Sequence, residues 1–513
     1  MTLARNTLGC VASAGLLAWL QHPDGVKLFT PIALVPWLVV TQRGGGSAAA
    51  VSGALTGTAY GCLVAPWLPE ALRALGSSPA TAVTGVLVTA AWAKAPIFAG
   101  LGLVAWLVRR STITVAVTAF AMAVFGLEWA ASTAGSGVPW ALIGHSQLPV
   151  PGVSQLAVSG GVPLVSALVA AVNVAVARLF GSDRTAAMRA CAALVAAWIS
   201  LALLGLPLAG ALRPEPHDPT HELLILQPDL PRGERWGDDL QALNLRRVRS
   251  FLERSAQRDL TGISAIVLPE NLLTTPVDAA PELLAELQQW VDHLGVPVVT
   301  GLAMAPHARN PDLYRGGVVW IEPGRGITAR IDKVRAVPVL ESSRKLPGES
   351  LLAPLFGEAA GWKKVEEAAD AGPLRGGVTL TPVLCYEALF HRLVAERRSP
   401  DSVAIVNLAD DGWVAGDAAT RQLTAFASFR AIEQRLTLIR VAHGGLSVVV
   451  DPFGHQIEAL PLDTYATTRV TVRAMPPPTL HEKIAIVALP AGTGLGVWWI
   501  VGILFTLDRR HRE

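Results

Sequence analysis

The segment Val378-Thr-Leu-Thr-Pro-Val-Leu-Cys-Tyr-Glu387 joins an apolar, β-rich run to a polar turn. A continuous apolar run of this length predicts a buried strand that ends at Leu384. Cys385 then opens the turn Cys385-Tyr-Glu387, which precedes a helix. A strand-to-helix elbow of this kind exposes a side chain at the sheet edge, where helix-terminal N–H groups lower the pKa of a thiol. The segment therefore predicts a cysteine nucleophile on an α/β fold.

Cys385 is also set apart from the other cysteines of the chain. Those three, Cys10, Cys62 and Cys191, lie in apolar stretches, where cysteine behaves as a small hydrophobe. Cys385 is alone in the charged middle of the chain, so it has no disulfide partner there. A lone thiol in an oxidising compartment either awaits a partner or acts as a nucleophile. The cysteine count leaves both interpretations open.

Short β-rich runs alternate with amphipathic helices from residue 222 onward, which is typical of an α/β sandwich. Strands are predicted at 223–227, 265–269, 297–302, 317–321, 378–384, 403–407, 437–441, 447–451 and 469–473. Helices are predicted at 237–257, 281–293 and 417–435. The segment 342–375, rich in Gly, Ala, Lys and Glu, is predicted to be a mobile insertion or lid.

Two charged residues accompany the cysteine as candidates. Glu270 ends the predicted strand 265–269, where a carboxylate can act as a base, although a solvated strand end is the alternative. Lys333, in Ile331-Asp-Lys-Val-Arg335, is by itself typical of a surface lysine. No histidine has a spacing that suggests a Cys/His pair, and no His/Cys cluster suggests a metal site. Neither a metal nor another cofactor is predicted.

Charge is distributed unevenly along the 513 residues, of which 51% are hydrophobic and 16% charged. An ordinary soluble domain has about 25% charged residues. Residues 1–213 contain 15 charged side chains and residues 484–513 contain 5, while 62 lie between them. We therefore predict a membrane domain of about seven helices over 1–213 and a water-facing catalytic domain over 214–483. A final transmembrane helix and a basic tail occupy 484–513.

The Lys and Arg content of the short loops predicts the orientation. The apolar stretches are 8–20, 28–41, 47–68, 81–108, 113–131, 162–178, 190–212 and 484–507. With a cytoplasmic N-terminus, the cytoplasmic side holds Arg5, Arg43, Arg109, Arg110, Arg178, Arg184, Arg189, Arg509, Arg510 and Arg512. The other side holds only Lys27, Arg73 and Arg213. Because basic loops stay in the cytoplasm, the large domain is predicted outside the cytoplasmic membrane. Basic residues confined to membrane flanks argue against nucleic acid as a partner.

Two charges lie inside apolar stretches, Lys94 and Glu128. Such groups are costly in lipid and mark either a function or a buried pair. The uncharged segment 132–161, which contains Trp140, is predicted to be a re-entrant or interfacial segment through which lipid reaches the site.

The order Glu270 in Leu-Pro-Glu, Lys333 in Ile-Asp-Lys and Cys385 in Leu-Cys-Tyr-Glu resembles the signature of the nitrilase superfamily. Together with the apolar stretches, nearly the whole chain resembles an apolipoprotein N-acyltransferase. The resemblance implies an αββα, nitrilase-like domain combined with membrane helices. Further matches to the family are Glu128-Trp129, Val138-Pro-Trp140, Gly144-His-Ser-Gln147, Gln227, Trp236, Glu341, Arg430-Ala-Ile-Glu433 and Arg440.

The chain departs from the family pattern near the substrate region. The family's Leu-Val-Pro-Phe-Gly-Glu reads Ala336-Val-Pro-Val-Leu-Glu341 here, and its Asn-Asp-aromatic motif reads Asp410-Asp-Gly-Trp413. The Arg that usually follows Glu-Trp is missing, since Trp129 precedes two alanines. Gln422 and His443 stand where the family favours His and Asn. These departures leave the Glu-Lys-Cys triad intact.

The resemblance implies ping-pong acyl transfer in a bacterial cytoplasmic membrane. The acyl donor is a phospholipid, and the acceptor is the α-amine of a diacylglyceryl-cysteine at a lipoprotein N-terminus. Glu270 acts as the base, Cys385 carries a thioester, and Lys333 stabilises the oxyanion.

The implied supporting residues are Glu341, Glu387 and Tyr386, although Glu387 equally suits a helix-start carboxylate that binds N–H groups. Trp236, Trp140 and Trp413 are candidates for substrate binding, although interfacial tryptophans are also common membrane anchors.

Two other functions remain open on the sequence. The first is a membrane-tethered amidase or nitrilase-type hydrolase, which uses the same triad with water as acceptor. The second is a non-catalytic scaffold that binds lipoproteins, and the intact triad argues against it.

Overall fold

A computed structural model describes residues 2–74, 76–133, 138–181, 184–212, 215, 219–228, 241–273, 275–305, 314–337, 341, 372–413, 416–480 and 483–484. The chain divides into two compact units. The first comprises residues 1–66, 86–213 and 478–513, and the second comprises 67–85 and 214–477. The predicted final span from residue 485, residues 342–371 of the predicted lid, and Trp236 lie outside the described residues.

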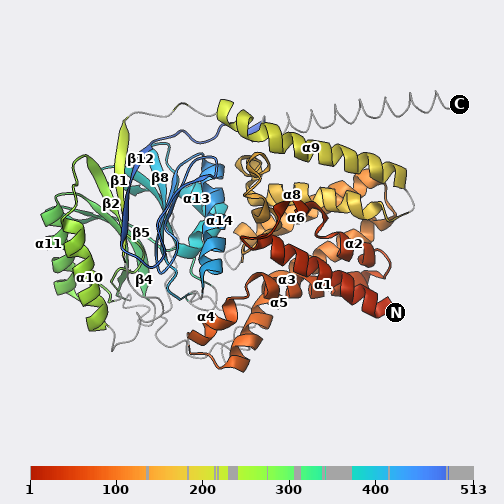
Figure 1. The fold of residues 1–513 in the computed structure, drawn as a ribbon, viewed down its shortest axis with the longest axis horizontal. Helices are drawn as coiled ribbons and strands as arrows, with labels where there is room; N and C mark the ends of the chain where they lie inside the picture. The colour runs from red at the N-terminus through yellow and green to blue at the C-terminus, as the bar shows by residue number, and fades with distance from the viewer. Residues whose placement is uncertain are drawn as a thin grey trace. The chain divides into compact units, whose positions relative to one another are not determined.

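The first unit is helical. Its longer helices are α1 (Thr2–Gln21), α3 (Gly46–Val64), α5 (Pro79–Leu107), α6 (Ile113–Thr133), α8 (Ala157–Arg178) and α9 (Arg184–Ala211), with the shorter α2 (Val35–Thr41) between α1 and α3 (Figure 1). Among the described residues, five helices are long and apolar enough to cross a membrane, namely α3, α5, α6, α8 and α9. Lys27–Thr41 forms a shorter apolar helical segment. The division of 1–213 into seven spans therefore stays a prediction.

The segment Trp140–Gly144, which includes the start of the 3₁₀ helix η3 (Ile143–Gln147), lies within this unit and is mostly buried. Its backbone groups are bonded by side chains from five helices. Gln21 of α1 donates to the Leu142 carbonyl (2.8 Å), Tyr60 of α3 to that of Ala141 (2.7 Å), and Lys94 of α5 to those of Trp140 and Ala141. Glu128 of α6 accepts the Ile143 N–H (2.9 Å), and Ser166 of α8 accepts the Gly144 N–H (2.7 Å). The two intramembrane charges thus bond to this backbone, as irregular backbone in an apolar region requires.

The second unit contains two six-stranded sheets. The first has the order β12-β1-β2-β3-β4-β5, with β1 (Thr220–Gln227), β2 (Ile263–Val267), β3 (Val298–Met304), β4 (Arg315–Glu322), β5 (Gly326–Asp332) and β12 (Ala466–Arg473). The second has the order β11-β10-β9-β8-β7-β6, with β6 (Leu374–Arg375), β7 (Thr379–Leu384), β8 (Ser402–Asp410), β9 (Leu438–His443), β10 (Val448–Val450) and β11 (Gln456–Ala459).

The two sheets pack face to face, and helices cover their outer faces (Figure 1). The core between the sheets contains Val267 and Trp320 from the first sheet and Leu380, Leu408 and Val441 from the second. Helices α10 (Gln241–Ala256) and α11 (Pro281–Leu294) pack on the first sheet, and α13 (His391–Arg397) and α14 (Asp417–Gln434) pack on the second. This αββα sandwich is the predicted fold class.

All nine predicted strands and all three predicted helices of this unit are present, with ends shifted by a few residues. Three strands were not predicted: β5, β6 and β11. β5 and β11 lack an apolar run because they are edge strands whose residues are mostly half-buried or exposed. The omission of β5 matters, because Lys333 directly follows it and was therefore not expected to be buried.

Leu408 is fully buried between the two sheets. We predict that Leu408→Ala destabilises the catalytic unit by about 2–5 kcal/mol, because a Leu-to-Ala change in a core leaves a cavity. Unfolding of the detergent-solubilised chain would measure the loss. Ile457→Ala is the matched control, since Ile457 on the edge strand β11 is 60% exposed. Equal effects of the two variants would contradict this core.

Candidate active site

Glu270 is held by strand β3 just beyond the end of β2. The Leu268 N–H donates to the Val299 carbonyl (2.8 Å), and the Gly301 N–H donates back to Pro269 (3.2 Å). The next residue, Asn271, donates to the Gly301 carbonyl (3.0 Å) with a positive φ of 54°. A Cβ on Gly301 would lie 2.7 Å from the Glu270 Cα. Only glycine at position 301 therefore lets the Glu270 backbone approach β3 this closely.

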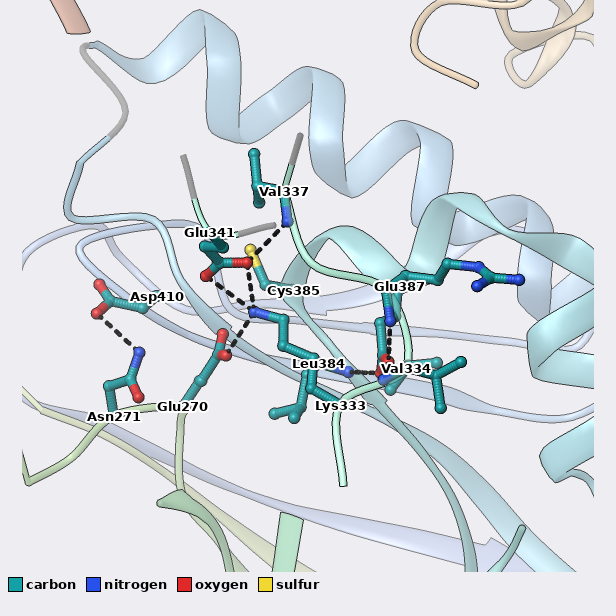
Figure 2. Close-up of polar contacts among 12 residues, drawn as sticks. Glu270, Asn271, Lys333, Val334, Val337, Glu341, Leu384, Cys385, Glu387 and Asp410 are labelled. Atoms are coloured by element: carbon teal, nitrogen blue, oxygen red, sulfur yellow. Dashed lines mark hydrogen bonds and ion pairs between the residues drawn. The ribbon is translucent and has the colours of Figure 1, made fainter. Parts of the chain in front are cut away.

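Lys333 is buried at the end of β5 and binds two carboxylates. Its N–H donates to the Gly316 carbonyl (2.8 Å), which continues the β4–β5 pairing by one residue. The side chain is 1% exposed, and Nζ lies 3.1 Å from Glu270 Oε1 and 2.8 Å from Glu341 Oε2. Glu341 in turn accepts the Val337 N–H (2.9 Å). The lysine thus holds the two carboxylates in one cluster (Figure 2).

Cys385 lies at the elbow that the sequence predicted. Strand β7 ends at Leu384, and the 3₁₀ helix η5 (Cys385–Leu389) begins at the cysteine. Its φ is +43°, a conformation that costs free energy in a residue other than glycine and recurs at functional sites. Asn407 of β8 donates to the carbonyls of Val383 (3.2 Å) and Cys385 (3.3 Å), which supports the elbow. The charges of Glu270 and Lys333 are close enough to the sulfur to shift its pKa, and Figure 2 shows the three residues together.

Burial and mutual proximity shift the pKa of all three groups. Burial raises the pKa of Glu270 to about 7; the Lys333 ammonium opposes this rise, whereas the carboxylates of Glu341 and Asp410 add to it. Burial alone lowers the pKa of Lys333, but Glu270 and Glu341 outweigh it and raise that pKa well above its usual value. Burial, then Glu270, raises the pKa of Cys385. At neutral pH the resting site therefore holds a lysine cation and a neutral thiol beside a carboxyl group poised to exchange a proton.

Glu387 lies near this cluster and binds backbone rather than the Lys333 ammonium. Its carboxylate accepts the N–H groups of Val334 (2.6 Å) and Leu384 (2.9 Å) and pairs with Arg397 (2.5 Å). Glu387 was also predicted as a carboxylate that binds N–H groups at a helix start. The Leu384 contact fits that prediction, because Leu384 directly precedes η5. The Tyr386 ring is buried edge-on against Phe390, with 5.3 Å between the ring centroids.

The candidate substrate-binding tryptophans fall in different parts of the chain. Trp413 belongs to the catalytic unit and contacts the Trp67 ring edge-on, with 6.3 Å between centroids. Trp67 Nε1 also donates to Gln422 Oε1 (3.3 Å), so residue 422 contributes to the same contact. Trp140 belongs to the helical unit, where its carbonyl accepts from Lys94.

Two contacts near the site, one partly and one fully buried, were not anticipated from the sequence. Asn271 Nδ2 lies 3.5 Å from Asp410 Oδ2, which links the ends of β2 and β8. Arg397 pairs with Glu387 across ten positions of the chain. A charged residue in the last turn of a short helix usually faces solvent, so no local signal marked Arg397 as buried. Over the described part of the chain, no group of three or more His, Cys, Asp or Glu side chains could hold a metal ion.

Comparison with known proteins adds two matches that follow one another along the chain. Residues 13–175 match the apolipoprotein N-acyltransferase N-terminal domain, and residues 235–475 match the carbon-nitrogen hydrolase family. The chain is 27% identical to the apolipoprotein N-acyltransferase of Bradyrhizobium diazoefficiens over 77% of this chain and 74% of that protein. It is 25% identical to the apolipoprotein N-acyltransferase of Geobacter metallireducens over 91% of this chain and 89% of that protein. The chain belongs to the apolipoprotein N-acyltransferase family.

Membership of this family confirms the predicted resemblance and the combination of apolar helices with a nitrilase-like domain. The relative from Rhizobium leguminosarum is 30% identical over 68% of this chain and 66% of its own length. Among solved structures, an amidase from Nesterenkonia sp. is similar, with 16% identity, a TM-score of 0.37, and coverage of 50% of this chain and 91% of that one.

Gly301→Ala tests how closely Glu270 depends on β3. The new Cβ would displace the Glu270 backbone, and a shift of about 1 Å in a reacting group can lower a rate about 100-fold. We expect that loss in acyl-transfer rate with the chain still folded. Gly372→Ala is the control, because a Cβ there meets nothing within 4 Å. Full activity of Gly301→Ala would contradict this placement of Glu270.

Proposed function

We propose that this membrane-bound acyltransferase N-acylates lipoproteins through an acyl thioester on Cys385. Family membership supports the acyltransferase activity. The observation that carries the proposed mechanism is the buried cluster in which Lys333 binds both Glu270 and Glu341 beside the Cys385 sulfur. A base, a cation and a nucleophile in one buried site are the components that acyl transfer requires.

In the first half-reaction, Glu270 takes the proton of the Cys385 thiol, because the thiolate and not the thiol attacks. The sulfur forms a bond to the ester carbonyl carbon of a phospholipid acyl chain, and the carbonyl oxygen becomes an oxyanion. The ester C–O bond then breaks. The leaving alkoxide takes the proton back from Glu270, so that a lysophospholipid leaves and the acyl group remains on Cys385.

Lys333 is suited to stabilise the oxyanion, together with a backbone N–H near Cys385. Its ammonium stays charged, because the carboxylates of Glu270 and Glu341 hold its pKa well above the usual value after burial has lowered it. A positive charge in a buried site acts with less screening than in water. Glu341 supports this role because it accepts a second hydrogen bond from Nζ, of 2.9 Å (Figure 2).

In the second half-reaction, the neutral α-amine of a diacylglyceryl-cysteine attacks the thioester carbonyl. Glu270 takes the proton from the nitrogen of the tetrahedral intermediate and passes it to the departing Cys385 sulfur. The products are an amide on the lipoprotein and a free thiol. Cys385 is only 5% exposed. This burial supports the two-step reaction, because it limits the access of water to the thioester.

The same proposal places the activity at a membrane surface. Both substrates carry lipid chains, and five described helices are long and apolar enough to span a bilayer. We further propose that the catalytic unit lies on the outer side of the bacterial cytoplasmic membrane. The support is the concentration of arginines in the loops that a cytoplasmic N-terminus places inside.

Intact mass spectrometry tests the thioester directly. The purified chain is incubated with a phospholipid, beside a Cys385→Ala control. We expect an adduct of acyl mass on the wild-type chain alone, and we expect a diacylated lipopeptide to discharge it. Failure of every phospholipid to form an adduct, combined with Cys385-dependent cleavage of small amides, would replace the proposal with a membrane-tethered hydrolase.

The rate of thioester formation should depend on the ionisation of Glu270. Burial raises the pKa of Glu270 to about 7, so the basic form increases as the pH rises through 7 and is lost below it. We expect kcat/KM to fall about tenfold per pH unit on the acid side of this midpoint. Asp410→Asn should move the midpoint of this fall in kcat/KM to lower pH, because the Asp410 carboxylate raises the pKa of Glu270.

Glu458→Gln is the control for this shift, because Glu458 is exposed on the edge strand β11. An unchanged pH midpoint of kcat/KM in Asp410→Asn, or an equal shift of that midpoint in Glu458→Gln, would contradict its assignment to Glu270.

A further inference from the structure

The ion pair between Glu387 and Arg397 is the most completely buried charge pair of the site region. Both side chains have an exposed fraction of 0%, and Arg397 Nη1 lies 2.5 Å from Glu387 Oε2. Glu387 belongs to η5, which begins at Cys385, and Arg397 ends helix α13. In the part of the chain that the structure describes, neither side chain hydrogen-bonds to the Lys333 ammonium or the Cys385 sulfur. Their effect on the site must therefore pass through the groups that they bind.

These groups are backbone atoms on both sides of the two reactive residues. On the lysine side, Arg397 Nη2 donates to the Asp332 carbonyl (3.0 Å), and Glu387 accepts the N–H groups of Val334 (2.6 Å) and Arg335 (3.1 Å). On the cysteine side, Arg397 Nη1 donates to the Pro382 carbonyl (3.0 Å), and Glu387 accepts the Leu384 N–H (2.9 Å). Figure 2 shows Glu387 between the Val334 and Leu384 backbones.

The position of the pair is significant because Lys333 and Cys385 come from different sheets. Lys333 follows β5, an edge strand of the first sheet, and Cys385 follows β7 of the second. Backbone ladders fix each strand within its own sheet and not against a strand of the other sheet. The pair binds the end of β5 and the end of β7 at once, so it links the two reactive segments directly.

We propose that Arg397 is a positioning residue for acyl transfer, which sets the place of Lys333 relative to Cys385 through Glu387. The inference rests on the proposed function, since it assumes that Lys333 stabilises the oxyanion formed on the acyl group. An oxyanion donor acts only within about 2.7–3.1 Å of the developing charge. A displacement of about 1 Å is enough to lower the rate about 100-fold.

The alternative role for a buried ion pair is general stability. Desolvation of two charges offsets much of their attraction, so a buried pair is weak evidence for a stabilising role. The contacts also favour positioning, because among the described residues the side-chain bonds of the pair outside itself go to residues 332–335 and 382–384. The guanidinium fork contacts both segments simultaneously, which a lysine at position 397 could not reproduce.

The neighbouring Arg398 provides a matched control. It lies next to Arg397, is half-buried, and donates to the carbonyls of Gln434 and Met475, away from the two reactive segments. Loss of Arg398 should therefore destabilise the same part of the fold without moving Lys333. Arg397→Met and Arg398→Met are compared in purified full-length chains for thermal stability and for kcat and KM of thioester formation on Cys385.

We expect Arg397→Met to lower kcat about 100-fold with KM for the phospholipid unchanged. Arg398→Met removes hydrogen bonds to two backbone carbonyls, so it should lower the unfolding temperature and leave kcat within about threefold. Arg397→Lys keeps the positive charge but lacks the planar guanidinium donors, so we expect an intermediate loss in kcat. This variant replaces Arg397→Met in the experiment if Arg397→Met does not fold. Equal losses in kcat for the Arg397 and Arg398 variants, or full activity of Arg397→Lys, would overturn the positioning role.

A double-mutant cycle with Lys333→Met separates positioning from instability. If Arg397 acts through Lys333, Arg397→Met should cost no further rate once the lysine is absent, whereas independent effects multiply. Multiplied losses would overturn the inference and leave the proposed function intact. A wild-type chain that forms no thioester with any phospholipid overturns the proposed function, and the positioning role with it.

Discussion

The burial of one ammonium group between two carboxylates is the constraint on which the site depends. Lys333 Nζ lies between Glu270 and Glu341 at 3.1 and 2.8 Å. Removing these charges from water costs several kcal/mol per ion, and the arrangement persists only where the geometry lets them compensate each other. The β3 contacts behind Glu270 and the β4 contact of Lys333 supply that geometry. The αββα sandwich therefore acts as a frame that holds a charge cluster together in a buried place.

The same burial shapes the resting state of the nucleophile. A thiol surrounded by apolar groups and carboxylates is harder to ionise, and the pKa of Cys385 is raised for this reason. Burial likewise raises the pKa of Glu270 to about 7. The positive φ of Cys385 places it at the start of η5, directly after strand β7.

In the helical unit, too, buried polar groups need bonding partners, and here the groups belong to the backbone of an apolar region. Backbone from Trp140 to Leu142 leaves the helical pattern, and the short 3₁₀ helix η3 follows, inside an apolar unit where unpaired N–H and C=O groups are costly. Side chains of Gln21, Tyr60, Lys94, Glu128 and Ser166 bond these groups from five helices. The two charges that stood out in apolar sequence thus bind the backbone of an irregular segment.

The sequence by itself determined the features that depend on neighbours along the chain. Hydrophobic periodicity predicted the strands around the core and the apolar helices, and the order Glu270, Lys333, Cys385 predicted the family. It could not predict that Lys333 is buried, because β5 has no apolar run. It also missed Arg397, whose partner groups at Asp332 lie 65 positions away. Such contacts were decided only by the tertiary structure, because packing two sheets face to face brings together charges that carry no local pattern.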